Sequence, residues 1–192
     1  MNQKIDLIAM RHSLAHILAS AVLELFPDAK FGIGPVVENG FYYDIDIPSK
    51  KLTEKDLISI EQTMKRIIKK DFQFETYNLD IDKAIKWAKS NKQDYKLELL
   101  NDLKRSGTTQ FKDLNKSELG TIADDKTKIE KVSFYKHGDF TDLCRGPHLN
   151  STCEAGPFKL LRISGAYWRG NENNNQLQRI YGVAFSSKFR FI

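Results

Sequence analysis

Three of the four histidines and one of the two cysteines lie in two short patterns that could form one site. His12 and His16 are four positions apart in a segment that reads as a helix, so both imidazoles lie on one face, one turn apart. Cys144 and His148 have the same spacing, but Pro147 disfavours a helix there and predicts a loop that can turn both side chains toward one point. Three imidazole nitrogens and one thiolate would give zinc a tetrahedral ligand set.

Each of the two patterns alone has a plainer interpretation. A histidine pair at this spacing on an apolar helix is more often packed and hydrogen-bonded than catalytic, and only the second pattern shifts the balance toward a site. A zinc peptidase is disfavoured because Ser13, and not glutamate, directly follows His12. We predict that Cys153 is a small packed or surface thiol and that His137, next to Gly138, is a turn residue.

The elements that must position these residues follow from the spacing of apolar side chains. Between residues 6 and 26 they recur mostly at steps of one, three and four, which predicts a helix that ends at Pro27. Asn39 and Gly40 fit a tight turn, and the alternation after them predicts a β-hairpin with one buried face. Thr53 can cap a second helix that runs to about residue 70.

The rest of the chain reads as strands and short helices. Strands are predicted at residues 72–79, 129–135, 158–163 and 177–185. Short helices are predicted from residue 80 and over 94–103, and the polar residues 104–128 predict an exposed excursion. This order predicts an α+β fold: a mostly antiparallel sheet, the long N-terminal helix packed on it, and a smaller helical lobe.

Composition limits the class of protein. The 192 residues suit one domain, and 41% hydrophobic with 29% charged side chains is near the globular average. The longest apolar stretch, residues 14–26, is shorter than the roughly 20 residues of a spanning helix, so no membrane partner is expected. Two cysteines and a start without a leader pattern predict a cytoplasmic protein. A net charge of +5 is compatible with a polyanionic partner without proving one.

Six ordered blocks of sequence carry a resemblance to a known family. They are residues 11–16 (RHSLAH), 33–36 (IGPV), 39–44 (NGFYYD), 142–148 (DLCRGPH), 164–170 (SGAYWRG) and 178–182 (QRIYG). In this order they resemble the editing domain of bacterial-type threonyl-tRNA synthetases, and alanyl-tRNA synthetase editing domains share the two metal-like motifs. The resemblance implies a single tRNA-editing domain over residues 1–192, without an aminoacylation core or an anticodon-binding domain.

The resemblance also implies a reaction, the hydrolysis of serine esterified to the 3′ end of threonine tRNA. A synthetic site for threonine cannot strongly reject serine, because a missing methyl changes binding by only about 1–3 kcal/mol, so a second, hydrolytic pocket removes the error. The implied partners are the serine-carrying acceptor end of tRNA(Thr) and the catalytic core of the synthetase, in cis or in trans. The alternatives are a noncatalytic module that binds the acceptor end, a structural zinc domain, and a freestanding alanyl-type deacylase.

The family's functional positions carry over to six residues of this chain. They are His12, His16, Lys96, Asp142, Cys144 and His148. Ester hydrolysis requires an activated water and a stabilised oxyanion, and we predict that His12 and Lys96 supply them. Without the resemblance, Lys96 would be a solvated helix lysine.

The other four of these residues have supporting roles. Cys144 and His148 are expected to position water or the amine of serine, with His16 as their partner and Asp142 as an orienting or amine-binding carboxylate. The resemblance favours no required metal or other cofactor. Zinc, held by the two histidines of the helix with Cys144 and His148, is the alternative.

Four further residues are predicted to bind the substrate. Tyr43 matches an aromatic wall of the family's pocket, although packing inside the hairpin is as good an interpretation for either Tyr42 or Tyr43, since alternate residues face opposite ways. Arg145, Arg169 and Arg179 are candidates for contacts with tRNA phosphates or the terminal adenosine. Surface salt bridges are the alternative for each arginine.

Overall fold

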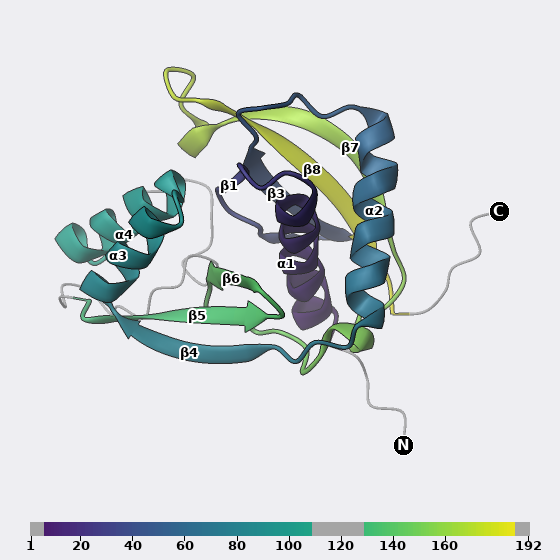
Figure 1. Ribbon diagram of the computed structural model, residues 1–192, viewed down its shortest axis with the longest axis horizontal. Coiled ribbons are helices and arrows are strands. Elements are labelled where there is room, and N and C mark those ends of the chain that lie inside the picture. Colours follow the sequence, from purple (N-terminus) through teal and green to yellow (C-terminus); the bar gives the residue numbers. More distant parts are fainter. Residues whose placement is uncertain (1–5, 109–128, 187–192) are drawn as a thin grey trace.

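The computed structural model describes residues 6–108 and 129–186, which form two antiparallel sheets and the helices that cover them (Figure 1). In chain order the elements are α1 (Leu7–Leu25), β1 (Lys30–Phe31), β2 (Val36–Val37), β3 (Gly40–Asp46), α2 (Glu54–Lys69), β4 (Glu75–Asp80), α3 (Ile81–Ser90), α4 (Asp94–Ser106), β5 (Lys131–His137), β6 (Phe140–Leu143), η2 (Thr152–Glu154), β7 (Phe158–Tyr167), η3 (Trp168–Gly170) and β8 (Gln176–Ala184). The α+β class is confirmed, with two sheets where one was expected. Within these residues, no helix combines the length and apolar character needed to cross a membrane.

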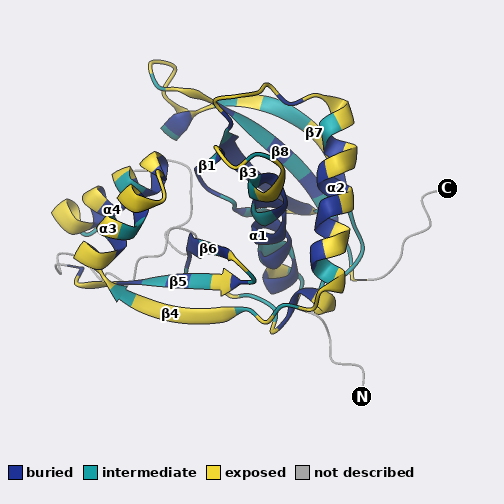
Figure 2. Ribbon diagram, in the orientation of Figure 1, coloured by how far each residue is buried: buried dark blue, intermediate teal, exposed yellow. Residues whose placement is uncertain are grey.

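The larger lobe consists of a five-stranded sheet, in the order β1-β3-β8-β7 with β2 also paired to β3, and the helices α1 and α2. The side chain of Asp6 caps α1 by accepting hydrogen bonds from the amides of Ile8 and Ala9, and Pro27 follows its end. Figure 2 shows α1 buried along most of its length. The core between helices and sheet includes Met10, Leu14, Ile17, Leu18, Phe41 and Ile45.

The predicted hairpin forms from β2 and β3, but the prediction that only one of its faces is buried is wrong. On the face turned away from α1, the guanidinium of Arg179 lies 4.0 Å from the ring centre of Tyr42. The same guanidinium donates two hydrogen bonds, of 2.6 and 2.8 Å, to the carboxylate of Asp44. Cross-strand partners therefore cover the polar face of β3, which an alternating sequence pattern does not reveal.

The smaller lobe consists of the sheet β4-β5-β6 with α3 and α4 beside it (Figure 1). Its core includes Ala84, Leu100, Leu103, Val132 and Phe134. Strand β6 was not predicted from the sequence, because its four residues are too few for a periodic signal. The predicted fourth helix is present and extends to Ser106, where Gly107 ends it with a φ of +70°. Most of the predicted excursion, residues 109–128, lies outside the described residues.

A buried side chain at the start of α4 helps to connect the two lobes. The carboxamide of Gln93, at the start of α4, accepts a hydrogen bond of 2.9 Å from the amide of Phe31 and donates one of 3.1 Å to the carbonyl of Ala29. Two residues later, the hydroxyl of Tyr95 donates to Asp46 on β3 at 2.8 Å. These bonds hold the beginning of α4 against the edge of the larger sheet.

Candidate active site

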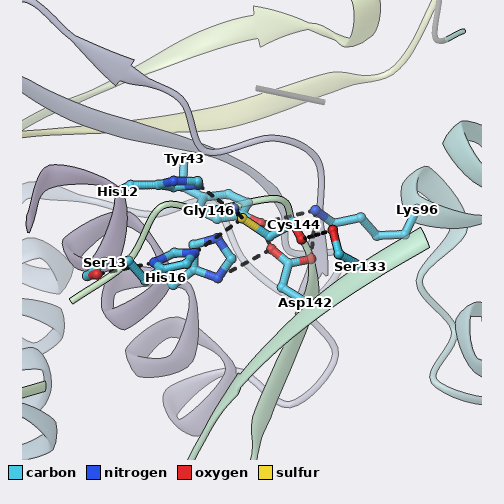
Figure 3. Close-up of polar contacts among 10 residues, drawn as sticks. His12, Ser13, His16, Tyr43, Lys96, Ser133, Asp142, Cys144 and Gly146 are labelled. Carbon is cyan, nitrogen blue, oxygen red and sulfur yellow. Dashed lines mark hydrogen bonds and ion pairs between the residues drawn. The ribbon is translucent and has the colours of Figure 1, made fainter. Parts of the chain in front are cut away.

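The two motifs meet between α1 and the loop that follows β6 (Figure 3). One potential ligand atom from each of His12, His16, Cys144 and His148 lies within 4.8 Å of the other three. The Sγ atom of Cys144 is 3.2 Å from Nε2 of His12 and 3.2 Å from Nε2 of His148. The prediction that a helix and a loop bring these four side chains to a common point is confirmed.

The loop of the second motif is held by backbone bonds and by ring packing. The amide of Cys144 donates to the carbonyl of Ser133 at 3.1 Å, and the hydroxyl of Ser133 donates to the carbonyl of Cys144 at 2.7 Å. Gly146 has a φ of +79°, and a Cβ there would lie 2.5 Å from the hydroxyl of Tyr135, so glycine is required. The ring of Tyr135 also packs against His148, with centroids 4.3 Å apart.

A buried charged cluster lies beside the histidines and consists of Lys96 from α4, Asp142 from β6 and Tyr43 from β3 (Figure 3). The ammonium of Lys96 is 2.7 Å from a carboxylate oxygen of Asp142 and donates to the hydroxyl of Tyr43 at 3.2 Å. Tyr43 donates to the other oxygen of Asp142, and Nδ1 of His16 is 3.9 Å from that oxygen. Lys96 is only 4% exposed, so its interpretation as a solvated helix lysine is wrong.

Burial keeps the imidazoles and the thiol neutral. It lowers the pKa of His12 from 6.5 to about 4 and lowers the pKa values of His16 and His148 well below 6.5. It raises the pKa of the Cys144 thiol to about 12. At neutral pH the site therefore offers unprotonated imidazoles, which can accept a proton from water, next to the ion pair of Lys96.

A cavity of about 30 Å³ lies between the histidines and the charged cluster. Its polar lining comes from His12, His16, Lys96, Asp142 and Cys144, and Tyr43 forms part of its wall. A cavity needs roughly 10–15 Å³ to hold one water molecule, so there is room for water between the imidazoles and the ammonium. The arrangement can place a nucleophilic water between a base and a cation.

The histidines and Cys144 also fit zinc by residue type and by spacing. Within the described part of the chain, Nδ1 of His16 is a buried nitrogen without a hydrogen-bond partner. Because burial raises the pKa of Cys144, binding of a metal would have to release the thiol proton. When bound, zinc would polarise a water molecule or an ester carbonyl at this position.

The three arginines predicted to contact tRNA lie outside the lining of this cavity. Arg169 forms ion pairs with Glu98 at 2.9 Å and with Asp102 at 2.6 Å. Arg179 is bound to β3 as described above, so both guanidinium groups stabilise the fold. Arg145, in the loop of the second motif, is half-buried, and burial lowers its pKa. Of the three arginines, it is the one next to a site residue in the sequence, because it directly follows Cys144.

We expect Arg169→Ala to lower the free energy of unfolding by about 1–3 kcal/mol and to change tRNA affinity little. The change removes the ion pair of Asp102 with Arg169 and leaves this largely buried carboxylate paired with Arg105. Urea unfolding measures the loss, and Lys104→Ala, which breaks an exposed pair with Asp82, is a control expected to cost less than about 1 kcal/mol. Unchanged stability with weaker tRNA binding and a flatter salt dependence would assign Arg169 to substrate recognition instead.

His137 is a buried strand residue, so the prediction of a turn residue is wrong. It ends β5, is 2% exposed, and packs against the rings of Phe74 and Phe140 with centroids 4.8 and 5.5 Å away. Its Nε2 atom has no hydrogen-bond partner among the described residues. Burial lowers its pKa from 6.5 to about 4, because the charged ring would have neither water nor a partner.

This histidine makes the fold sensitive to acid. The unfolded chain takes up its proton near pH 6.5 and the folded chain only near pH 4, so stability is complete above pH 6.5 and is lost as the pH falls toward 4. The difference corresponds to roughly 3 kcal/mol. We expect His137→Phe, which keeps the ring packing, to reduce the loss of unfolding free energy between pH 7 and 4.5 by roughly 2–3 kcal/mol. Equal losses in parent and variant would contradict this.

Ser13 is the member of the site that the sequence analysis did not identify. Its hydroxyl accepts the amide hydrogen of Leu149 at 2.9 Å and lies 3.2 Å from Nδ1 of His148. The available signal was its position directly after His12, on a helix whose next residues are apolar. A buried hydroxyl there needs a partner, and the second motif supplies it.

Comparison with known proteins agrees with the motifs. Residues 132–181 match a family model described as the threonyl and alanyl tRNA synthetase second additional domain. The chain is 46% identical over 94% of its length to a threonine–tRNA ligase of Acetivibrio thermocellus and 47% identical over 96% to one of Sulfurihydrogenibium. It is 48% identical over 95% of its length to the threonine–tRNA ligase of Dehalococcoides mccartyi. The resemblance to threonyl-tRNA synthetases is therefore confirmed.

The chain covers only part of these relatives. It spans 25% of the Acetivibrio ligase, 26% of the Sulfurihydrogenibium ligase and 27% of the Dehalococcoides ligase. The matched family model covers β6, the second motif, β7 and most of β5 and β8, and so includes Asp142, Cys144 and His148. His12 and Lys96 lie outside that model but inside the segment shared with the ligases.

Proposed function

We propose that this chain is the editing module of a threonyl-tRNA synthetase and that it hydrolyses the ester between serine and the 3′ end of threonine tRNA. The observation that carries the proposal is the cavity in which neutral imidazoles from α1 face the buried pair of Lys96 and Asp142. The similarity to threonine–tRNA ligases supports the choice of substrate. Their synthetic core, in cis or in trans, is the proposed partner, and the cytosol is the proposed location.

His12 is the proposed general base. Water in the cavity attacks the ester carbonyl while its proton passes to the imidazole, which is unprotonated because its pKa is about 4. The tetrahedral intermediate then breaks its bond to the ribose oxygen, which takes up that proton from the imidazolium and leaves as the ribose hydroxyl. The products are free serine and uncharged tRNA, and no oxidant or reductant is involved.

Lys96 is the proposed electrostatic stabiliser. Lys96 lines the same cavity as His12, and its ammonium can approach the oxygen that becomes negative in the intermediate. Asp142 and Tyr43 position this ammonium through contacts of 2.7 and 3.2 Å. Asp142 is thus an orienting carboxylate, already occupied by a lysine and a tyrosine, which leaves it poorly suited to bind the amine of serine.

The test is to mix the purified chain with threonine tRNA charged with serine and, separately, with threonine. Release of serine at a much higher rate than threonine supports the editing function. Binding of both charged tRNAs without release of either supports the noncatalytic module. Release of serine from alanine tRNA charged with serine, in preference to release of serine from threonine tRNA, supports the alanyl-type deacylase.

We expect hydrolysis to proceed without zinc, although the ligand set fits the metal. The thiol of Cys144 lies within hydrogen-bond distance of His12 and His148 without a metal, and water can occupy the cavity. Elemental analysis and dialysis against a chelator measure the requirement, with full activity expected after dialysis. Stoichiometric zinc that is lost in His16→Ala, together with inactivation by the chelator, would show a metal-dependent site.

A further inference from the structure

We propose that Ser13 fixes the tautomer of His148, so that His148 faces the site as a hydrogen-bond donor while His12 faces it as an acceptor. The hydroxyl of Ser13 is fully buried on α1, accepts the amide hydrogen of Leu149 at 2.9 Å and lies 3.2 Å from Nδ1 of His148. A serine hydroxyl has one hydrogen to donate. Among the described residues, Nδ1 of His148 is the acceptor within its reach, so Nδ1 accepts and Nε2 carries the imidazole proton.

The donor and acceptor of each remaining hydrogen bond in the cluster follow from this tautomer of His148. The Nε2–H group of His148 donates to Sγ of Cys144 at 3.2 Å, and the amide of Gly146 donates to the same sulfur at 3.2 Å. With two donors on it, the sulfur directs its own hydrogen to Nε2 of His12, 3.2 Å away. His12 in turn donates to the backbone of Pro147, and we assign this N–H to Nδ1 because Nε2 faces the sulfur. Pro147 has no amide hydrogen, so its carbonyl is the acceptor.

This series gives the two imidazoles different tasks. Sγ of Cys144 occupies the position between the two Nε2 atoms, so the thiol must turn away before water can reach Nε2 of His12. Water in its place accepts a hydrogen bond from Nε2–H of His148 and gives its proton to His12. If Nδ1 of His148 carried the proton instead, Nε2 of both histidines would be acceptors, and neither imidazole could donate a hydrogen bond to the water. Ser13 is therefore a positioning residue that acts through His148, and this catalytic part of the inference rests on the proposed hydrolysis.

The tautomer can be read without any substrate. The chain is labelled with ¹⁵N-histidine, dialysed against a chelator so that no metal occupies Nε2, and its ring nitrogens are assigned by nuclear magnetic resonance with single His→Gln variants. We expect a pyridine-type Nδ1 and a protonated Nε2 for His148, and the reverse for His12. A protonated Nδ1 in His148 overturns the inference, whatever the chain hydrolyses.

The catalytic consequence needs the variants of the hydroxyl. Ser13→Ala should convert His148 to a mixture of tautomers and lower the single-turnover release of serine about tenfold, the value of one hydrogen bond. Ser13→Thr, which keeps a hydroxyl, should restore both readouts, and Ser20→Ala on the same helix should change neither. An unchanged tautomer and full rate in Ser13→Ala overturn the inference. Absence of any serine release by the parent chain would refute the proposed hydrolysis, while the tautomer is decided by the spectrum alone.

Discussion

We expect His12→Ala to lower the single-turnover rate of seryl-tRNA hydrolysis by about a hundredfold or more, with a melting temperature close to that of the parent chain. His12 lines the cavity and is incompletely buried, and its polar contacts are with the thiol of Cys144 and the backbone of Pro147. Alanine is compatible with the interior of α1 and leaves no buried charge behind. The loss should therefore fall on the chemistry and spare the fold.

Two measurements separate these effects for His12. Rapid mixing of enzyme in excess over seryl-tRNA gives the rate of the chemical step, and thermal unfolding followed by circular dichroism gives the stability. His137→Phe is the matched control, because it removes a buried histidine that lies outside the cavity, and it should keep the parent rate. Loss of the cooperative transition in His12→Ala, or an undiminished rate, would return this histidine to a structural role.

We expect Lys96→Met to abolish hydrolysis to a similar extent and, unlike His12→Ala, to destabilise the fold by about 3–5 kcal/mol. The lysine is the cation that compensates the buried carboxylate of Asp142, 2.7 Å away. Methionine has a similar length, so packing is largely kept while the charge is lost. The carboxylate is then left with the hydroxyl of Tyr43 as its remaining close partner in the cluster.

A double variant distinguishes the two roles of Lys96. Adding Asp142→Asn removes the unpaired charge, so most of the stability should return while hydrolysis stays at least about a hundredfold slower. Urea unfolding and single-turnover kinetics on the parent, both single variants and the double variant complete the cycle. A double variant as unstable as Lys96→Met would contradict the pairing argument, and a Lys96→Met variant with full activity would contradict the catalytic one.

The helices were predictable from the sequence because their signals are local. The apolar spacing of residues 6–26 and the pairing of Thr53 with Asp56 fall within a few turns of one segment, and the structure confirms both helices. The meeting of His12 with Cys144 was predicted by chemistry, from the presence of complementary residue types in two motifs. Fold periodicity alone contains no such information.

The charged cluster depended on contacts far apart in the chain. Lys96 and Asp142 are brought together by α4 and by β6, a strand too short for a periodic signal. A single lysine on a helix is ordinarily expected to be exposed to solvent. The burial of Asp44 under Arg179 and the burial of His137 against Phe74 likewise depend on residues that are distant in sequence. Only the family resemblance identified Lys96 in advance.

The hydrogen bonds of Gln93 between the two lobes should become more stable when a ligand binds. His12 and Tyr43 belong to the larger lobe and Lys96 and Asp142 to the smaller one, so a bound ester that contacts both sets selects the docked arrangement. Binding free energy then adds to the two hydrogen bonds that Gln93 makes across the boundary. An occupied site should consequently slow hydrogen exchange at the amide of Phe31. Bound substrate would then stabilise the contact between the two lobes that together form its binding site.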